Sequence, residues 1–238
     1  MTRQPPPRSR SAGVGGSWRR LYLAGSIAAV VYVVLVLVPI VLVFVAPVPP
    51  VEGRAVLEFI AAHKALYLTE LVCFVGLAVP ALVVFAALAV AVSPVDKSIA
   101  ALGGLFGIAS EIIALALGSS PQSLHGGLVV LSNAYVKAAD ETRRAGLGSA
   151  ADALIAATNA VSWAGILTAA GILLLSLLMR GLSTGVAILG VVAGALGIVS
   201  EALRPVIGSA YLVYGLLLPT WFALVGWKLL RLARQDVT

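Results

Sequence analysis

Two glutamates lie inside long apolar segments of the chain, and they are the residues best suited to chemistry. Glu111 lies in GIASEIIALALGSS and Glu201 lies in GIVSEALRPVIGSA; each follows a serine and comes four residues after a glycine. A carboxylate in hydrocarbon costs at least about 2 kcal/mol unless it is paired, hydrated or protonated. Such a group can bind a cation, carry a proton or serve as a general acid.

The sequence motifs of other common site chemistries do not occur. The histidines His63 and His125 are too few for a three-histidine zinc site, and the single Cys73 rules out a Cys-x-x-Cys motif and an internal disulfide. There is no zinc-protease, nucleophile-elbow, Walker A or dinucleotide-binding signature. We therefore expect no metal and no cofactor.

The elements that must position these glutamates are membrane helices. The chain of 238 residues is 61% hydrophobic and 11% charged, whereas soluble chains carry about 25% charged residues. Its charge-free runs reach or exceed the ~20 residues that cross a bilayer. The prediction is an all-α fold, a polytopic membrane helix bundle at 20–232, between a disordered basic tail at 1–19 and a short tail at 233–238.

Six transmembrane helices are expected, together with one interfacial helix. The spans are 20–46, 64–92, 94–118, 152–179, 184–204 and 209–231. The sequence SAAD at 149–152 has the spacing of a capping box and is assigned to the start of the fourth span. Pro39, Pro80 and Pro219 fall inside spans and predict kinks there. The region 121–151 fits no span, so an interfacial helix around 126–140 is predicted, with a re-entrant segment as the alternative.

The basic residues favour one orientation in the membrane. Of the 16 Lys and Arg residues, ten fall on the N-terminal side of the predicted bundle and six on the other. Cytoplasmic segments carry the excess of basic residues, so both termini are expected in the cytoplasm. Membrane orientation also accounts for the net charge of +6. The lipid bilayer is the expected partner, and no nucleic-acid binding is expected.

A possible internal repeat relates the two glutamates. Residues 93–120 align without gaps with 183–210. The identical pairs are Ser93/Ser183, Gly104/Gly194, Gly107/Gly197, Ile108/Ile198, Ser110/Ser200, Glu111/Glu201, Gly118/Gly208 and Ser119/Ser209. The Gly103-x-x-x-Gly107 and Gly190-x-x-x-Gly194 pairs let another helix approach closely, and the glutamates should lie near the same face. A duplication of spans 2–3 as spans 4–5 would make a parallel repeat.

Both glutamates are expected near the outer edge of the hydrocarbon. Each comes 18 residues after the first residue of its aligned segment, which is roughly 27 Å along a helix axis. Other polar side chains fall at a similar depth, so we expect a pocket open to the external face. Its candidate ligand-binding residues are Glu70, Glu111, Asn159, Glu201, Arg204 and Tyr211. The alternatives are that Glu201 and Arg204 form a local helix pair, that Glu111 makes a structural hydrogen bond, and that Glu70 is merely interfacial.

The C-terminal third carries the segments NAVSWAGILTAAGILLLSLLM, GIVSEALRP and YGLLLPTWFALVGWKLLRL. Over roughly 151–232 it resembles an uncharacterised bacterial family of polytopic membrane proteins, a domain of unknown function. The resemblance implies a multi-pass protein of the bacterial inner membrane. It carries over no activity.

Three functions fit these residues. The first is a non-enzymatic membrane protein whose outer pocket binds or passes a small molecule, lipid or ion, with Glu111 and Glu201 as paired sites and Arg204 as counter-charge. An alternative is a membrane-embedded enzyme that uses Glu111 and Glu201 for acid catalysis on an apolar lipid or isoprenoid substrate. A second alternative is a structural subunit of a membrane complex.

Overall fold

The structure is a computed structural model that describes residues 18–117, 124–161, 164–207 and 211–235. Within these ranges every regular element is a helix, as the all-α prediction requires. Of the predicted disordered tail, only Trp18 and Arg19 are described, and the first helix begins at Arg19. The last helix continues to Gln235, three residues beyond the predicted end of the membrane domain.

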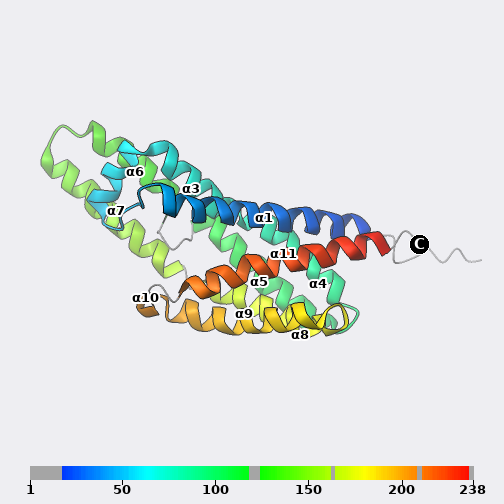
Figure 1. The fold of residues 1–238 in the computed structure, drawn as a ribbon. Coiled ribbons are helices and arrows are strands. Elements are labelled where there is room, and N and C mark those ends of the chain that lie inside the picture. Colours follow the sequence, from blue (N-terminus) through cyan, green and yellow to red (C-terminus); the bar gives the residue numbers. More distant parts are fainter. Residues whose placement is uncertain (1–17, 118–123, 162–163, 208–210, 236–238) are drawn as a thin grey trace, which may run out of the picture.

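Five spans in the described part of the chain are long and apolar enough to cross a bilayer. They are α1 (Arg19–Val45), α3 with α4 (Lys64–Gly76 and Ala78–Val92), α5 (Lys97–Leu117), α9 (Thr184–Ala202) and α11 (Tyr211–Gln235). A shorter apolar helix, α8 (Gly165–Leu178), continues through the 3₁₀ turn Met179–Gly181. Together they form the helical membrane bundle seen in Figure 1.

The second span is interrupted where the proline predicts it. Helix α3 ends at Gly76 and α4 begins at Ala78. Pro80 has no N–H to donate to the carbonyl of Gly76, and its ring crowds that carbonyl, so the helix breaks one turn earlier. Of the three prolines predicted to disturb their spans, Pro80 follows a break in its helix, whereas Pro39 and Pro219 lie inside the uninterrupted helices α1 and α11.

The predicted start of the fourth span is wrong. The stretch 149–152 does not cap a membrane helix but lies inside α7 (Glu141–Val161), and the apolar helix α8 begins only at Gly165. The carboxylate of Asp152 accepts a hydrogen bond of 2.6 Å from the backbone N–H of Gly53. This contact ties α7 to the start of α2 (Gly53–Ala62), outside the membrane bundle.

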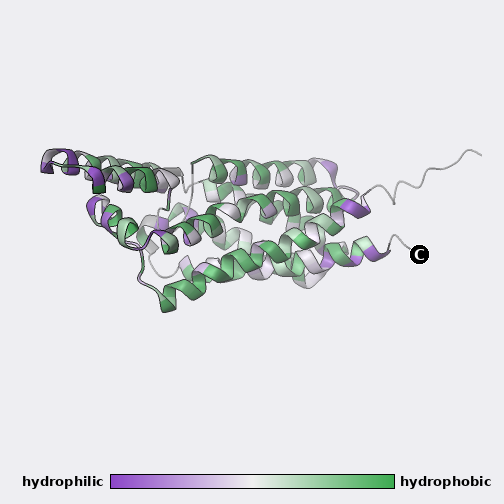
Figure 2. Cartoon of the chain, turned by 90° about the horizontal axis from the view of Figure 1, so that it is seen from above, coloured by the Kyte–Doolittle hydropathy of each residue, from purple (hydrophilic) through white to green (hydrophobic). Residues whose placement is uncertain are grey.

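Helices α2, α6 (Gly126–Lys137) and α7 pack together at one end of the bundle, and we call them the cap (Figure 1). Their shared apolar core includes Leu57, Ile60, Leu128 and Ile155. The helix expected around 126–140 therefore exists as α6, but it packs in this unit with two partner helices. Figure 2 shows hydrophilic residues gathered in the cap and at the opposite end of the bundle.

Charged residues on the surface of the cap pair with one another. Arg54 contacts Glu58 at 3.1 Å and Glu141 at 2.8 Å, and the Tyr135 hydroxyl donates to Glu58 at 2.8 Å. The hydrogen bond from Tyr135, then that from Arg54, lowers the pKa of Glu58. Since the side chains of Arg54, Glu58 and Glu141 are more than half exposed, their ion pairs contribute little to folding stability.

The glycine pairs act at the helix contacts that the sequence predicts. A Cβ on Gly171 of α8 would lie 2.8 Å from the carbonyl oxygen of Gly103 and from the amide nitrogen of Gly107 on α5. A Cβ on Gly194 of α9 would lie 2.7 Å from the backbone nitrogen of Leu173 on α8. Helix α8 thus lies between α5 and α9 at backbone contact, and the predicted close approach is confirmed.

The start of α1 and the end of α11 lie at the same end of the molecule. The Arg19 Nε–H donates to the carbonyl of Ala233 at 3.2 Å, and farther along the pair Tyr32 stacks on Phe222 with ring centroids 3.9 Å apart. The described ends of the chain therefore share one end of the bundle, opposite the cap (Figure 1). This arrangement agrees with an even number of crossings, which results when α8 is counted together with the five longer spans.

Candidate functional site

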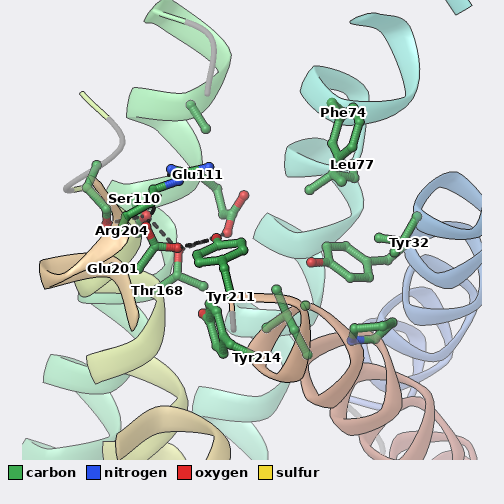
Figure 3. Close-up of a pocket in the computed structure, with 17 residues that line it drawn as sticks. Tyr32, Phe74, Leu77, Ser110, Glu111, Thr168, Glu201, Arg204, Tyr211 and Tyr214 are labelled. Atoms are coloured by element: carbon green, nitrogen blue, oxygen red, sulfur yellow. Dashed lines mark hydrogen bonds and ion pairs between the residues drawn. The ribbon is translucent and has the colours of Figure 1, made fainter. Parts of the chain in front are cut away.

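A cavity of about 180 Å³ lies inside the bundle near the cap end. Helices α1, α3, α5, α8, α9 and α11 surround it, together with Leu77 and the short helix α10 (Arg204–Ile207). Its lining residues are Tyr32, Val36, Phe74, Leu77, Ser110, Glu111, Ala114, Ala164, Gly165, Thr168, Glu201, Arg204, Tyr211, Tyr214, Gly215, Leu218 and Pro219. The cavity brings Glu111 and Glu201 together, as Figure 3 shows.

Glu201 is buried and held by groups that stabilise a carboxylate. It is 4% exposed, and the Tyr211 hydroxyl donates to its Oε1 at 2.6 Å. Arg204 approaches its Oε2 at 3.5 Å and lies 4.9 Å from the centre of the Tyr211 ring. The proposed local pair of Glu201 and Arg204 therefore exists. Both partners also line the cavity, so they belong to its polar wall.

A glycine makes room for the Glu201 carboxylate. A Cβ on Gly165, the first residue of α8, would lie 2.5 Å from the Glu201 carboxyl carbon. Real Cβ atoms essentially never come so close to another heavy atom, so a larger residue here would force the Glu201 carboxylate to move. The start of α8 is thereby fitted to the end of α9.

Glu111 is equally buried, at 6% exposure, but its contacts are neutral. The Thr168 Oγ1 lies 3.3 Å from the Glu111 Oε1 and 2.6 Å from the Ser110 Oγ. Ser110 uses its own hydrogen to donate to the carbonyl of Ala164 at 2.7 Å. The single hydrogen of Thr168 is thus shared between Ser110 and Glu111. Glu111 takes part in none of the three ion pairs that the described residues form.

Two further tyrosines reach the cavity from α1 and α11. Tyr32 is 3% exposed, and its hydroxyl points toward the cavity in Figure 3. Tyr214 packs edge-on against Tyr211, with ring centroids 5.8 Å apart. No hydrogen bond joins either hydroxyl, of Tyr32 or of Tyr214, to another residue in the described part of the chain. Both are available to a bound molecule.

The remaining wall of the cavity is apolar. It consists of Val36, Phe74, Leu77, Leu218 and Pro219. A cavity lined by carboxylates and hydroxyls as well as by hydrocarbon fits an amphipathic molecule, or a polar group with an apolar body.

Two predicted site residues lie elsewhere. Glu70 is 4% exposed on α3, and its Oε2 has no hydrogen-bond partner among the described residues, but Glu70 does not line the cavity. Asn159 is exposed on α7, because the helix that carries it belongs to the cap.

Several residues that line the cavity are not marked as site residues by the sequence. Tyr32, Thr168 and Gly165 come from helices whose facing directions are set only by packing. Ser110 carries a signal, since a serine precedes each glutamate in the repeat. Tyr32 is marked only by being polar within an otherwise apolar span.

No protein family model, curated protein or solved structure matches this chain. The resemblance of 151–232 to an uncharacterised bacterial family therefore stays a prediction.

Proposed function

We propose that this integral membrane protein binds, or passes across the membrane, a small molecule, lipid or ion in the cavity between Glu111 and Glu201. The observation that carries the proposal is the difference in their surroundings. Arg204 neutralises Glu201, whereas Glu111 has no cation within ion-pair distance in the described part of the chain. Glu111 is thus a carboxylate in the cavity whose charge a bound ligand can compensate.

The surroundings of Glu111 favour a particular ligand chemistry. An uncompensated carboxylate in an apolar setting is stabilised by a cation, by a proton or by strong hydrogen-bond donors. The tyrosine rings beside it attract cations through their faces. Within the proposed class, this favours a ligand with a cationic or hydrogen-bond-donating group at Glu111 and an apolar body against Phe74 and Leu218.

The proposal includes the orientation of the cavity. The excess of basic residues at the end that holds both termini supports a cytoplasmic location for that end. The cavity near the cap would then face the outside. The resemblance to a bacterial family supports the inner membrane as the location.

The test is a ligand titration of the purified protein. Tetramethylammonium and benzyltrimethylammonium chloride serve as cationic probes, sodium chloride serves as the ionic-strength control, and the melting temperature is measured. A ligand that binds only the folded state raises the melting temperature in a saturable manner. We expect this rise in the wild type and its loss in Glu111→Gln, a substitution that keeps the shape of the side chain.

Glu70→Gln is the matched control, because Glu70 is as buried as Glu111 but lies outside the cavity. It should respond to both probes as the wild type does. Equal responses of Glu111→Gln and wild type would contradict the proposal, and so would a wild type that responds to neither probe. If Glu111→Gln and Glu201→Gln both fail to insert, the glutamates serve the fold, which supports a structural subunit. Conversion of a lipid or isoprenoid by the purified protein would instead support carboxylate acid catalysis.

A further inference from the structure

A second hollow lies at the opposite end of the bundle from the cavity. It has a volume of about 210 Å³ and lies between the 3₁₀ turn after α8 and the end of α11. Its lining residues are Gly181, Leu182, Lys228, Arg231, Leu232 and Gln235. The hollow is lined by neither Glu111 nor Glu201.

The side chains around this hollow are positively charged. Lys228 and Arg231 line it, and Arg180 precedes Gly181 in the turn. No Asp or Glu is among the lining residues, and neither Lys228 nor Arg231 takes part in the ion pairs of the described residues. The hollow therefore offers two cations to an anionic ligand.

A tryptophan holds the two cations in place. The guanidinium carbon of Arg231 lies 3.8 Å from the centre of the Trp227 ring, and the Lys228 Nζ lies 4.9 Å from it. Contacts with the ring face restrict both side chains before a ligand arrives, which lowers the entropy lost on binding. Trp227 is 46% exposed near the end of an apolar helix, the position typical of residues at the level of lipid headgroups.

The start of α9 adds to the positive potential. Helix α9 begins at Thr184, two residues after Leu182, and its N-cap residue Ser183 makes no side-chain capping hydrogen bond. The first N–H groups of a helix carry a partial positive charge that favours anions. Leu182, two residues before this helix start, lines the hollow together with Lys228 and Arg231.

We propose that this hollow is a binding site for a phosphate group, held by Lys228 and Arg231. The depth of Trp227 at the bundle end favours the phosphate of an anionic phospholipid headgroup in the surrounding leaflet. Free phosphate offers the same chemistry, so the experiment must separate the two sources. The site is independent of the cavity near Glu111, and either can fail without the other.

The experiment uses the full chain in phosphatidylcholine vesicles that contain a fraction of brominated phosphatidylglycerol. Bromine quenches nearby tryptophan fluorescence, so Trp18, Trp163 and Trp221 are replaced by phenylalanine in every protein tested, and the remaining quenching then reports occupancy beside Trp227. The test variant is Lys228→Gln with Arg231→Gln. The control is Arg20→Gln with Arg234→Gln, which removes the same charge from the same end at exposed residues that do not line the hollow.

We expect the wild type to prefer phosphatidylglycerol over phosphatidylcholine. The test variant should lose roughly 10- to 30-fold in relative association, since each direct contact between a cation and the phosphate is worth about 1 kcal/mol, or roughly fivefold. The control should lose less than about 3-fold. An equal loss in both variants would show only diffuse surface attraction and overturn the proposal, as would a wild type without preference.

Titration with inorganic phosphate at constant ionic strength separates the sources. Relief of the quenching in the wild type, but not by chloride, would identify free phosphate as a competitor for the same site. Quenching that persists supports the lipid headgroup as the occupant. Arg231→Lys, in the presence of Lys228, should keep most of the binding if charge decides it. Equal melting temperatures of all variants check that the fold is intact.

Discussion

Glu111 and Glu201 occupy equivalent positions of the aligned segments 93–120 and 183–210, line the same cavity and are buried to a similar degree, but their partners differ. Glu201 has an arginine, a tyrosine hydroxyl and a glycine fitted to its carboxylate. Glu111 has only a shared threonine hydroxyl. The shared Gly-Ile-x-Ser-Glu stretch places each glutamate in the wall of the cavity. Residues outside that stretch decide which charges and hydrogen-bond donors surround it.

The largest effect is expected from removal of the arginine. Arg204→Ala leaves Glu201 buried without its counter-charge, and breaking a buried pair in this way costs about 3 kcal/mol. The free energy of unfolding in detergent measures the loss. In a Glu201→Gln background the same substitution should cost much less, whereas in a Glu111→Gln background the cost should remain. Equal costs in both backgrounds would mean that Arg204 does not distinguish the two carboxylates.

The next effect concerns the space beside Glu201. Gly165→Ala places a methyl group against the carboxylate and should destabilise the fold by about 2 kcal/mol. Gly215→Ala is the matched control, because Gly215 also lines the cavity but a Cβ there meets no atom within 4 Å. Since alanine favours helix, the control should stabilise α11 by up to about 1 kcal/mol. Thermal unfolding measures the melting temperatures of both variants. A shift in the same direction for both would contradict a close fit between Gly165 and the Glu201 carboxylate.

A smaller effect separates two tyrosines of the same helix. Tyr211→Phe removes the 2.6 Å hydrogen bond to Glu201 and should lower the free energy of unfolding by about 1.5 kcal/mol. Tyr214→Phe removes a hydroxyl that has no hydrogen-bond partner in the described part of the chain, so it should change stability by less than about 0.5 kcal/mol. Chemical unfolding of the pair measures the difference, and equal losses would refute the assignment of the Glu201 partner.

The smallest effect comes from a carboxylate paired at the surface. In the cap, the hydrogen bonds from Tyr135 and Arg54 lower the pKa of Glu58. These bonds therefore contribute stability that is fully present above the ordinary glutamate pKa of 4.5. The contribution is lost as the pH falls through the lower pKa of the folded state. Melting temperatures of wild type and Tyr135→Phe should therefore differ slightly at neutral pH and converge in acid. A difference that grew on acidification would show that Glu58 has another partner.

The helices that cross the membrane could be predicted well from sequence because the signal is local. A run of about 20 apolar residues must span or be buried. The glycine pairs also predict close helix contacts, which α8 makes with α5 and α9. The fourth span was the exception. Its apolar run continues from 153, so composition does not mark the break between α7 and α8, which depends on contacts with the distant helices α2 and α6.

The sequence by itself determined that the chain is a bundle of apolar helices with two buried glutamates in related positions. Periodicity and length suffice for that, because both act within a single helix. Only the tertiary structure decided that the glutamates share a cavity, that Arg204 neutralises one of them, and that Tyr32 and Thr168 complete the wall. These contacts join residues far apart in the chain, and their geometry depends on how each helix is rotated and packed.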